Sequence, residues 1–524
     1  MIYVIGSGPA GVAAAVALTR QGLPVTVLDV GLSLEPARAA AAGRMAARRP
    51  QQWAAADVAT VRENLRAGAG GVPLKVSFGS DFMYRDAEAH LPRRAAGVGV
   101  VPSFGRGGFG TVWGAAALPY LREELDEWPV APGELERRFA QVLSFVGLSG
   151  AADDLAERFP AYTDRLESLP ASRQAEELLG DLRRNREALR AQGFVFGRAR
   201  LAVASRNAGG HPCARCGLCM SGCPYGLIYN PATTLRELVT RGQVTYVPGV
   251  LVTGFAERGG EVHIEGRELA TGRTVRHVAS RLYVAGGVLG STKLYLASVG
   301  AYDHELVVRD SQYFLLPMLR YRGVPGVSGE GLHTLSQVFL EVFDPRLSAR
   351  SIHLQIYTYN ALYRQAVEAT LGAAYPALRP VSAALLRRML LVQGYLHADL
   401  SGEIGLTLRR DGVLDLQGRP GPHTRRVLRE LVAKLHRNRS SLRAVPLRPL
   451  LKLGEPGRGF HCGGTLPMRR QPGDFETDPL GRPAGFERVH LVDASVFPTV
   501  TASTITLTVM ANAYRIGAHE DAGR

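Results

Sequence analysis

The sequence predicts an α/β protein, α+β overall, because the period of its hydrophobic residues differs between two parts of the chain. Residues 2–30 alternate strand, helix and strand, the pattern of a parallel sheet. From about residue 310 to 417 the period changes to two, which indicates antiparallel strands. A chain of 524 residues is also too long for one simple core. We therefore expect a nucleotide-binding domain of Rossmann type and a second domain built on an antiparallel sheet.

The N-terminal unit carries a glycine motif between its strand and its helix. Ile2–Ile5 is a short apolar strand, Ala10–Gln21 has helical spacing and Val25–Leu28 is a second strand. The glycines of Gly6-Ser-Gly8-Pro-Ala-Gly11 allow a tight turn, close approach of pyrophosphate and close helix–strand packing. Asp29 closes the second strand, where a carboxylate can accept from a ribose 2′-OH. The motif predicts a dinucleotide site but does not separate FAD from NAD.

The second domain shows strand alternation and one hairpin signal. Ser351–Tyr359 places Ile352, Leu354 and Ile356 on one face, and Ile404–Leu408 alternates likewise. Asp411-Gly412 then indicates a hairpin turn. Val381–Leu396 has amphipathic helical spacing, typical of a helix that covers a sheet or lies at a membrane interface. Residues 121–204 predict surface helices.

The formal charge of +15 and pI of 9.9 raise the question of nucleic-acid binding. The sequence lacks a compact stripe of aromatic and basic residues, so we expect no nucleic-acid partner. A solvated arginine-rich face accounts for the charge, and contact with an anionic membrane surface is the alternative. The opening strand has no signal-peptide pattern and the five cysteines suggest a reducing compartment, so a cytoplasmic location is expected.

Four of the five cysteines lie in one short run with the spacing C-x2-C-x2-C-x3-C-P. They are Cys213, Cys216, Cys219 and Cys223. Bacterial ferredoxins hold iron–sulfur clusters with this spacing. The run therefore predicts an iron–sulfur cluster, with Cys223 the least certain ligand. Zinc and a metal-free loop of reduced thiols are the alternatives.

Several segments together resemble the glucose–methanol–choline (GMC) family of FAD-dependent oxidoreductases. They are Gly6–Gly11, Arg106–Gly114, Val284–Lys293, His461–Thr465 and Leu491–Pro498. They follow the order of the family across nearly the whole chain. The resemblance implies that the dinucleotide is FAD.

The resemblance also implies a division of the chain and a set of FAD-binding residues. Residues 1–120, 205–305 and 456–524 would form the FAD domain, 121–204 a helical insertion and 306–455 the substrate domain. With the N-terminal motif, the implied FAD-binding residues are Gly6, Gly8, Pro9, Ala10, Gly11, Asp29, Gly107, Gly108, Trp113, Gly114, Val252, Asp493 and Ala494.

His461 stands where the family places the residue beside the reacting hydroxyl. A neutral imidazole can take the hydroxyl proton as hydride leaves the carbon. The family's second His or Asn is missing, and Thr501 is the nearest counterpart in Thr499–Thr504. Either Thr501 positions the substrate, or His353 or His397 from the sheet domain supplies the second donor.

The expected function is an FAD-dependent dehydrogenase acting on a CH–OH group of an alcohol, sugar or sterol-like substrate. Electrons would then leave through the cluster to an external acceptor, with peripheral membrane contact as a further expectation. A cluster-free flavin oxidase or reductase of the same fold is the first alternative. A non-catalytic flavin and iron–sulfur electron-transfer module is the second.

Overall fold

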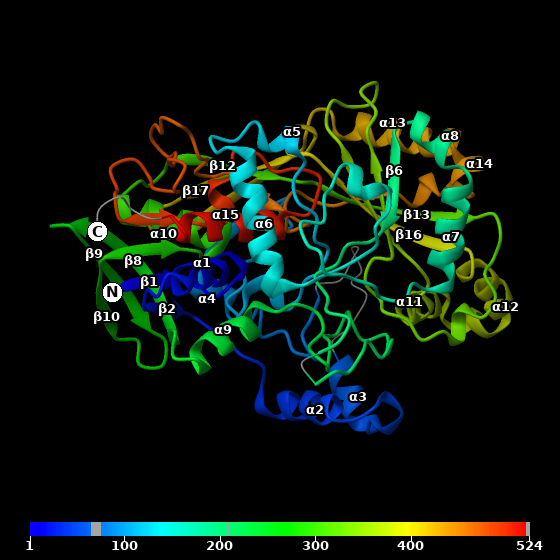
Figure 1. The fold of residues 1–524 in the computed structure, drawn as a ribbon, viewed down its shortest axis with the longest axis horizontal. Helices are drawn as coiled ribbons and strands as arrows, with labels where there is room; N and C mark the ends of the chain where they lie inside the picture. The colour runs from blue at the N-terminus through cyan, green and yellow to red at the C-terminus, as the bar shows by residue number, and fades with distance from the viewer. Residues whose placement is uncertain (64–74, 208, 520–524) are drawn as a thin grey trace.

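A computed structural model describes residues 1–63, 75–207 and 209–519. Its first sheet is parallel and takes strands from three distant parts of the chain (Figure 1). The strand order is β22-β11-β1-β2-β7, with β1 Ile2–Ile5, β2 Val25–Asp29, β7 Val244–Pro248, β11 Arg281–Val284 and β22 Val489–Leu491. The N-terminal, central and C-terminal segments therefore build one sheet.

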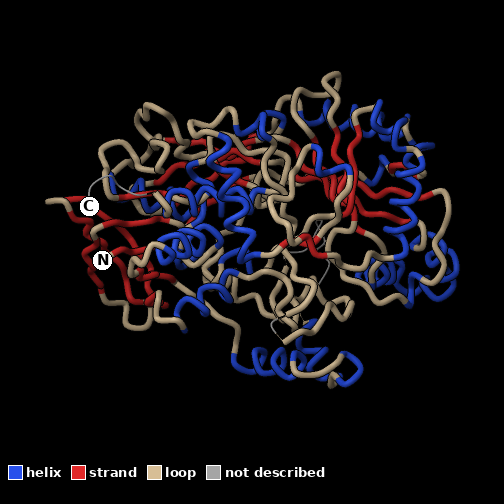
Figure 2. The backbone as a smooth tube through the Cα atoms, viewed as in Figure 1, coloured by secondary structure: helices blue, strands red, loops and turns tan. Residues whose placement is uncertain are grey.

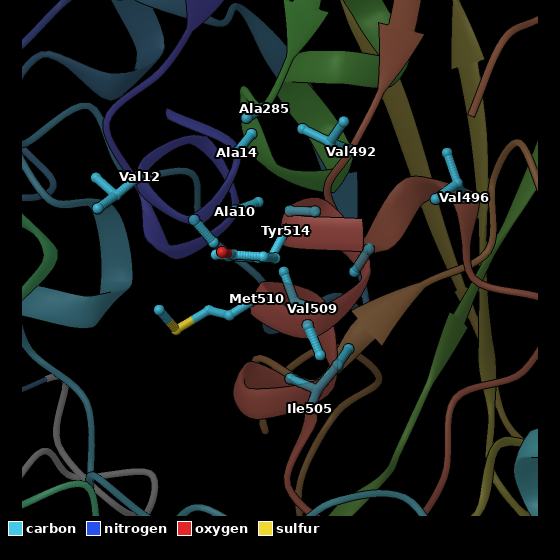
Figure 3. Packing of buried hydrophobic residues seen from close by; sticks show 14 of the residues in the cluster. Ala10, Val12, Ala14, Ala285, Val492, Val496, Ile505, Val509, Met510 and Tyr514 are labelled. Carbon is cyan, nitrogen blue, oxygen red and sulfur yellow. The ribbon is translucent and has the colours of Figure 1, made fainter. Parts of the chain in front are cut away.

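Helices rich in small and apolar residues cover this sheet. α1 (Pro9–Arg20) packs along α15 (Ile505–Gly517), and most residues of both helices are buried. Figure 3 shows Ala10 and Ala14 of α1 beside Met510 and Tyr514 of α15. Alanines let the two helices approach closely, because they add little side-chain volume at the contact. This packing fixes the N-terminus of α1 relative to the C-terminal segment.

A smaller antiparallel sheet follows β7, with β8 Val250–Arg258, β9 Glu261–Glu268 and β10 Thr274–Ala279. β8 has a register shift between Val252 and Gly254. The helix before them, α9 (Pro231–Thr240), is capped by the Asn230 side chain, which accepts from the Ala232 N–H at 2.9 Å.

Two further sheets contain the remaining long strands, and the strands of the smaller one pack in the same core as the parallel sheet. A seven-stranded sheet has the order β19-β13-β16-β15-β14-β6, with β20 paired to β13, and a five-stranded sheet has the order β21-β12-β17-β18-β3. The bounds are β3 Arg93–Ala96, β6 Phe194–Arg198, β12 Glu305–Asp310, β13 Tyr313–Arg320, β14 Val338–Val342, β15 Ile352–Tyr357, β16 Met389–Leu396, β17 Glu403–Leu408, β18 Leu414–Arg419, β19 Ala444–Pro446, β20 Lys452–Leu453 and β21 Cys462–Gly463. Figure 2 shows strands toward both ends of the long axis. The predicted antiparallel pairing and the β17–β18 hairpin are confirmed.

The remaining described helices lie around these sheets. They are α2 Pro36–Ala46, α3 Ala55–Arg62, α4 Ala87–His90, α5 Arg122–Leu125, α6 Pro132–Val146, α7 Arg173–Arg184, α8 Arg186–Ala191, α10 Gly287–Val299, α11 Ala361–Leu371, α12 Tyr375–Leu386, α13 Thr424–Arg437 and α14 Arg439–Leu442. A two-stranded pair, β4 Leu148–Ser149 and β5 Leu166–Glu167, completes the described strands. Within the described ranges, none of the helices has the length and apolar character needed to span a bilayer.

Three sequence predictions need correction. Val381–Leu396 is not one helix, because α12 ends at Leu386 and Met389–Leu396 is the central strand β16. The insertion 121–204 is not only helical, because its last residues form the edge strand β6 beside β14. The antiparallel strands of residues 310–417 do not form one sheet, because β17 and β18 belong to the five-stranded sheet and β13, β14, β15 and β16 to the seven-stranded sheet.

Candidate active site

A cavity of about 360 Å³ lies where β1 and β2 end and α1 begins. Residues from the N-terminal, central and C-terminal segments all line it, together with the strand start Val250–Thr253. Nine of the predicted FAD-binding residues are in this lining: Gly6, Gly8, Pro9, Ala10, Asp29, Gly108, Val252, Asp493 and Ala494. The structure thus brings most of the predicted cofactor residues to one cavity.

The glycine motif leaves the start of α1 open to a ligand. Gly6 has a φ of +92°, a left-handed conformation that favours glycine. Gly8 is the N-cap of α1, so no side chain caps the first N–H groups, and the first turn holds no acidic residue. Unpaired N–H groups and the helix dipole favour an anion at this point. The cradle fits the pyrophosphate of a dinucleotide.

Gly11 supports this turn from behind instead of lining the cavity. A Cβ at Gly11 would lie 2.0 Å from the backbone oxygen of Gly6 and 3.3 Å from the Ala285 side chain. Such a contact forces backbone to move, so only glycine allows α1 to pack against the turn. Gly11 is therefore a structural requirement of the cradle.

Asp29 lies at the end of β2 with two hydroxyl donors on its carboxylate. Ser7 Oγ donates to Asp29 Oδ2, and Tyr246 OH donates to the same oxygen at 3.0 Å. Burial raises the pKa of Asp29 to about 6, although both hydroxyls and Arg106 act to lower it. The position matches the predicted ribose partner, because the other carboxylate oxygen is free of these hydroxyl bonds.

We expect Asp29→Asn to weaken FAD binding by roughly tenfold, since the amide lacks the charge and brings an N–H toward two donors. Titrating FAD into the apoprotein measures the effect. Asp81→Asn is the control, because the Asp81 carboxylate is exposed and pairs only with Arg85 in the described contacts. Equal FAD affinities in Asp29→Asn and the wild type would contradict the assignment.

The C-terminal segment contributes Asp493 at the opposite wall. Its side chain accepts from Ser291 Oγ at 2.5 Å and from the Ser495 N–H at 2.9 Å. Burial raises the pKa of the Asp493 carboxyl. The start of α10, Gly286–Gly290, and Lys293 line the same wall. Asp493 therefore ties α10 to the C-terminal segment beside the cavity.

Residues 107–114 lie beside the cavity, and hydrogen bonds connect this segment to neighbouring loops. The Gly107 N–H donates to Ser7 Oγ at 2.9 Å, and a Cβ at Gly108 would lie 3.0 Å from the Cα of Gly8. Trp113 instead donates its indole N–H to the Tyr229 oxygen at 2.9 Å. Gly11, Gly107, Trp113 and Gly114 thus contact other protein groups instead of forming the described lining.

In the sequence, His461 lies between Phe460 and Cys462, which both line the cavity, although His461 is not itself in the lining. Its side chain is partly exposed, while its Nδ1 atom is buried without a hydrogen-bond partner among the described residues. Desolvation by the surrounding protein, with a smaller effect of the His353 charge, lowers the pKa of His461 to about 3. The imidazole is therefore neutral at physiological pH and able to accept a proton.

Tyr395 on β16 stacks on His461, a contact that the sequence did not indicate. Their ring centroids are 4.6 Å apart with an interplanar angle of 23°. The Tyr395 ring also stacks at 6.1 Å from His353. Tyr395 lies in the stretch expected to be a helix, so no sequence signal linked it to His461.

A buried polar chain runs along β15 behind Tyr395. Glu341 Oε1 and His353 Nδ1 are 2.6 Å apart, and Gln355 Nε2 lies 3.1 Å from His353 Nε2. Tyr357 OH then donates to Gln355 Oε1 at 3.2 Å. Of the two alternatives for the second donor, His353 belongs to this chain near His461.

The other two predicted partners have different neighbours. His397 Nε2 is 3.1 Å from Thr499 Oγ1, and the Asp399 N–H donates to His397 Nδ1 at 3.1 Å. Thr501 is fully buried, and its hydroxyl is 2.8 Å from Ser503 Oγ. Thr501 as a substrate partner stays a prediction.

The four clustered cysteines lie in the loop between β6 and α9. Burial raises the pKa of Cys216 to about 12 and of Cys223 to about 11, so these thiols are protonated at neutral pH. Burial also lowers the pKa of the neighbouring Lys75 to about 8. Among residues 1–63, 75–207 and 209–519, no three His, Cys, Asp or Glu side chains gather closely enough to hold a metal ion. The iron–sulfur cluster stays a prediction from the spacing of the four cysteines.

Asp310 is a buried carboxyl next to the site, and it predicts a pH effect on stability. It accepts from Cys462 Sγ at 3.5 Å, and burial raises its pKa to about 7 from the ordinary 3.8. A raised pKa stabilises the fold below pH 3.8, and this contribution is lost as pH rises through about 7. Between pH 5 and 8.5 the loss is roughly 3 kcal/mol.

Asp310→Asn should remove this pH dependence, because the amide does not ionise. Thermal unfolding of both proteins at pH 5 and 8.5 measures it. We expect the wild type to lose more stability than the variant across this range. Parallel losses would show that Asp310 is ionised in the folded protein at both pH values.

Comparisons with known proteins agree with this geometry. Residues 2–76 match the FAD binding domain family, and residues 426–513 match the GMC oxidoreductase family. The fold is similar to the crystal structure of pyridoxine 4-oxidase from Mesorbium loti, with a TM-score of 0.57, 15% identity and 98% of each chain covered. It is also similar to an FAD-dependent oxidoreductase from Chaetomium thermophilum, with a TM-score of 0.57, 13% identity and 98% of each chain covered. No curated protein sequence matches the chain.

Proposed function

We propose that this chain, an FAD-dependent oxidoreductase with the C-terminal domain of the GMC oxidoreductases, oxidises the CH–OH group of an alcohol. The observation that carries the proposal is the neutral His461 between two residues of the FAD cavity wall. A neutral imidazole at this place suits removal of a hydroxyl proton.

The residues of the chain divide the work between binding and proton transfer. The open start of α1 and Asp29 would hold the pyrophosphate and ribose of FAD. When bound, FAD supplies the acceptor for the hydride of the substrate carbon. A ring nitrogen of His461 takes the hydroxyl proton of the alcohol, so that the carbonyl product leaves uncharged.

Tyr395 and the β15 chain would position His461. Stacking on Tyr395 restricts the orientation of the His461 ring. The Glu341–His353 pair in turn holds the second ring on which Tyr395 stacks. These residues take the place of the His or Asn that the family has before its last helix.

The substrate class remains the broad one of alcohols, with sugars and sterol-like alcohols included. The similar structure of pyridoxine 4-oxidase makes pyridoxine one alcohol worth testing. The external electron acceptor and the cytoplasmic location are parts of the same proposal. No step is assigned to the cysteine run, because the described thiols do not form a metal site.

Anaerobic mixing of the FAD-loaded protein with a panel of alcohols, pyridoxine among them, tests this function. We expect at least one alcohol to bleach the flavin absorbance and to yield the matching aldehyde or ketone. A protein that stays oxidised with every alcohol, but is reduced by a reduced electron carrier, would be an electron-transfer module instead. Iron and labile sulfide in protein purified without oxygen would support the iron–sulfur cluster predicted from the cysteine spacing. Their absence would contradict that prediction.

A further inference from the structure

The exposed side of α12 is almost entirely apolar. Leu378, Val381 and Leu385 are 41%, 67% and 41% exposed, although α12 is only 12 residues long. The other exposed residues of the helix are prolines, alanines and one charged residue, Arg379. A surface helix of a soluble protein normally presents polar residues to water. A contiguous apolar face of this kind indicates a contact surface.

Positive charge surrounds this face. Residues 361–388 contain Arg364, Arg379, Arg387 and Arg388 but only one acidic residue, Glu368, which leaves a formal charge of four minus one, or +3. A cavity of about 1050 Å³ beside α11 and α12 adds Arg62 and Arg215 to its basic lining. Arginines next to an apolar helix face match a surface that is apolar inside and anionic outside.

We propose that α12 lies in the interface of an anionic lipid bilayer, with its apolar side among the acyl chains and the arginines at the headgroups. α11 and α12 form the outer corner of the molecule in Figure 1, so the helix can reach a flat surface. Two copies meeting through this face would bring two sets of arginines together. That repulsion favours lipid over a second copy of the chain. The inference is independent of the alcohol oxidation proposed above.

Cosedimentation of the FAD-loaded protein with vesicles tests the proposal. The vesicles contain phosphatidylcholine alone or a mixture with phosphatidylglycerol. We expect the wild type to pellet with the mixed vesicles and to be released as salt increases. Val381→Asp/Leu385→Asp should lower the bound fraction about tenfold, because two carboxylates replace the apolar contact. Arg379→Gln/Arg387→Gln should weaken the preference for anionic vesicles.

Val278→Asp is the matched control, because Val278 is 48% exposed and belongs to β10, a strand toward the other end of the long axis (Figure 1). It should bind vesicles like the wild type. FAD content and thermal unfolding, measured for each variant, separate loss of binding from loss of folding. The proposal is overturned if the wild type stays in solution with anionic vesicles or if all variants pellet alike. A dimer that Val381→Asp/Leu385→Asp dissociates would also overturn it, and would assign the face to self-association.

Discussion

His461→Gln is expected to slow reduction of the flavin by an alcohol roughly 10²–10⁴-fold while FAD remains bound. Glutamine resembles histidine in size and polarity, but its amide does not accept a proton at physiological pH. Stopped-flow mixing with a reactive alcohol measures the rate, and the flavin content of the purified variant measures binding. His461 lies between cavity residues and is not itself among those that form the cradle, so binding should survive.

The same reaction should show little dependence on pH near neutrality. The pKa of His461 is lowered to about 3 in the protein without FAD, so the ring stays neutral as pH falls from 8 to 5. His304→Gln is the matched control, because His304 is exposed, stacks on Phe475 and is not in the cavity lining. A His461→Gln enzyme that reduces flavin at the wild-type rate would show that another group takes the proton.

Gly11→Ala should abolish FAD binding and destabilise the parallel domain. Its Cβ would lie 2.0 Å from the Gly6 oxygen, far inside van der Waals contact, so α1 must move away from the glycine turn. The cradle at Gly8 and the packing of α1 on α15 would both be disturbed. Flavin content after purification and the thermal midpoint report the two effects, and we expect the variant to be isolated without flavin.

Gly43→Ala is the matched control for this substitution. Gly43 also lies inside a helix, α2, and a Cβ there would meet nothing within 4 Å. Because alanine is the better helix former, this variant should gain about 0.5–1 kcal/mol and keep its FAD. Equal FAD contents in the two variants would contradict the packing role assigned to Gly11.

Much of the cavity lining could be predicted because short local patterns determine it. Gly6, Gly8 and Asp29 belong to one βαβ unit, whose turn places them at the same sheet edge whatever the rest of the chain does. Asp493 was predicted instead from the order of the segments that resemble the GMC family. The sequence of residues 489–498 does not by itself show that their strand pairs with β11.

The catalytic surroundings were harder to predict, because they depend on contacts between distant strands. Tyr395 meets His461 only because β16 pairs with β13 and β15 in the middle of a sheet. The apolar residues of Val381–Leu396 fit the spacing of a helix as well as that of a strand. Periodicity alone therefore does not decide between a helix and a strand. Glu341 and His353 are likewise neighbours through β14–β15 pairing, which the sequence does not specify.

The most direct test of the account is anaerobic reduction of the bound flavin by alcohols, followed in the wild type and in His461→Gln. The account predicts that an alcohol bleaches the wild-type flavin and releases a carbonyl product, while the variant with full FAD content reacts at least about a hundredfold more slowly. Flavin that no alcohol reduces in the wild type, or equal rates in the two proteins, would contradict it.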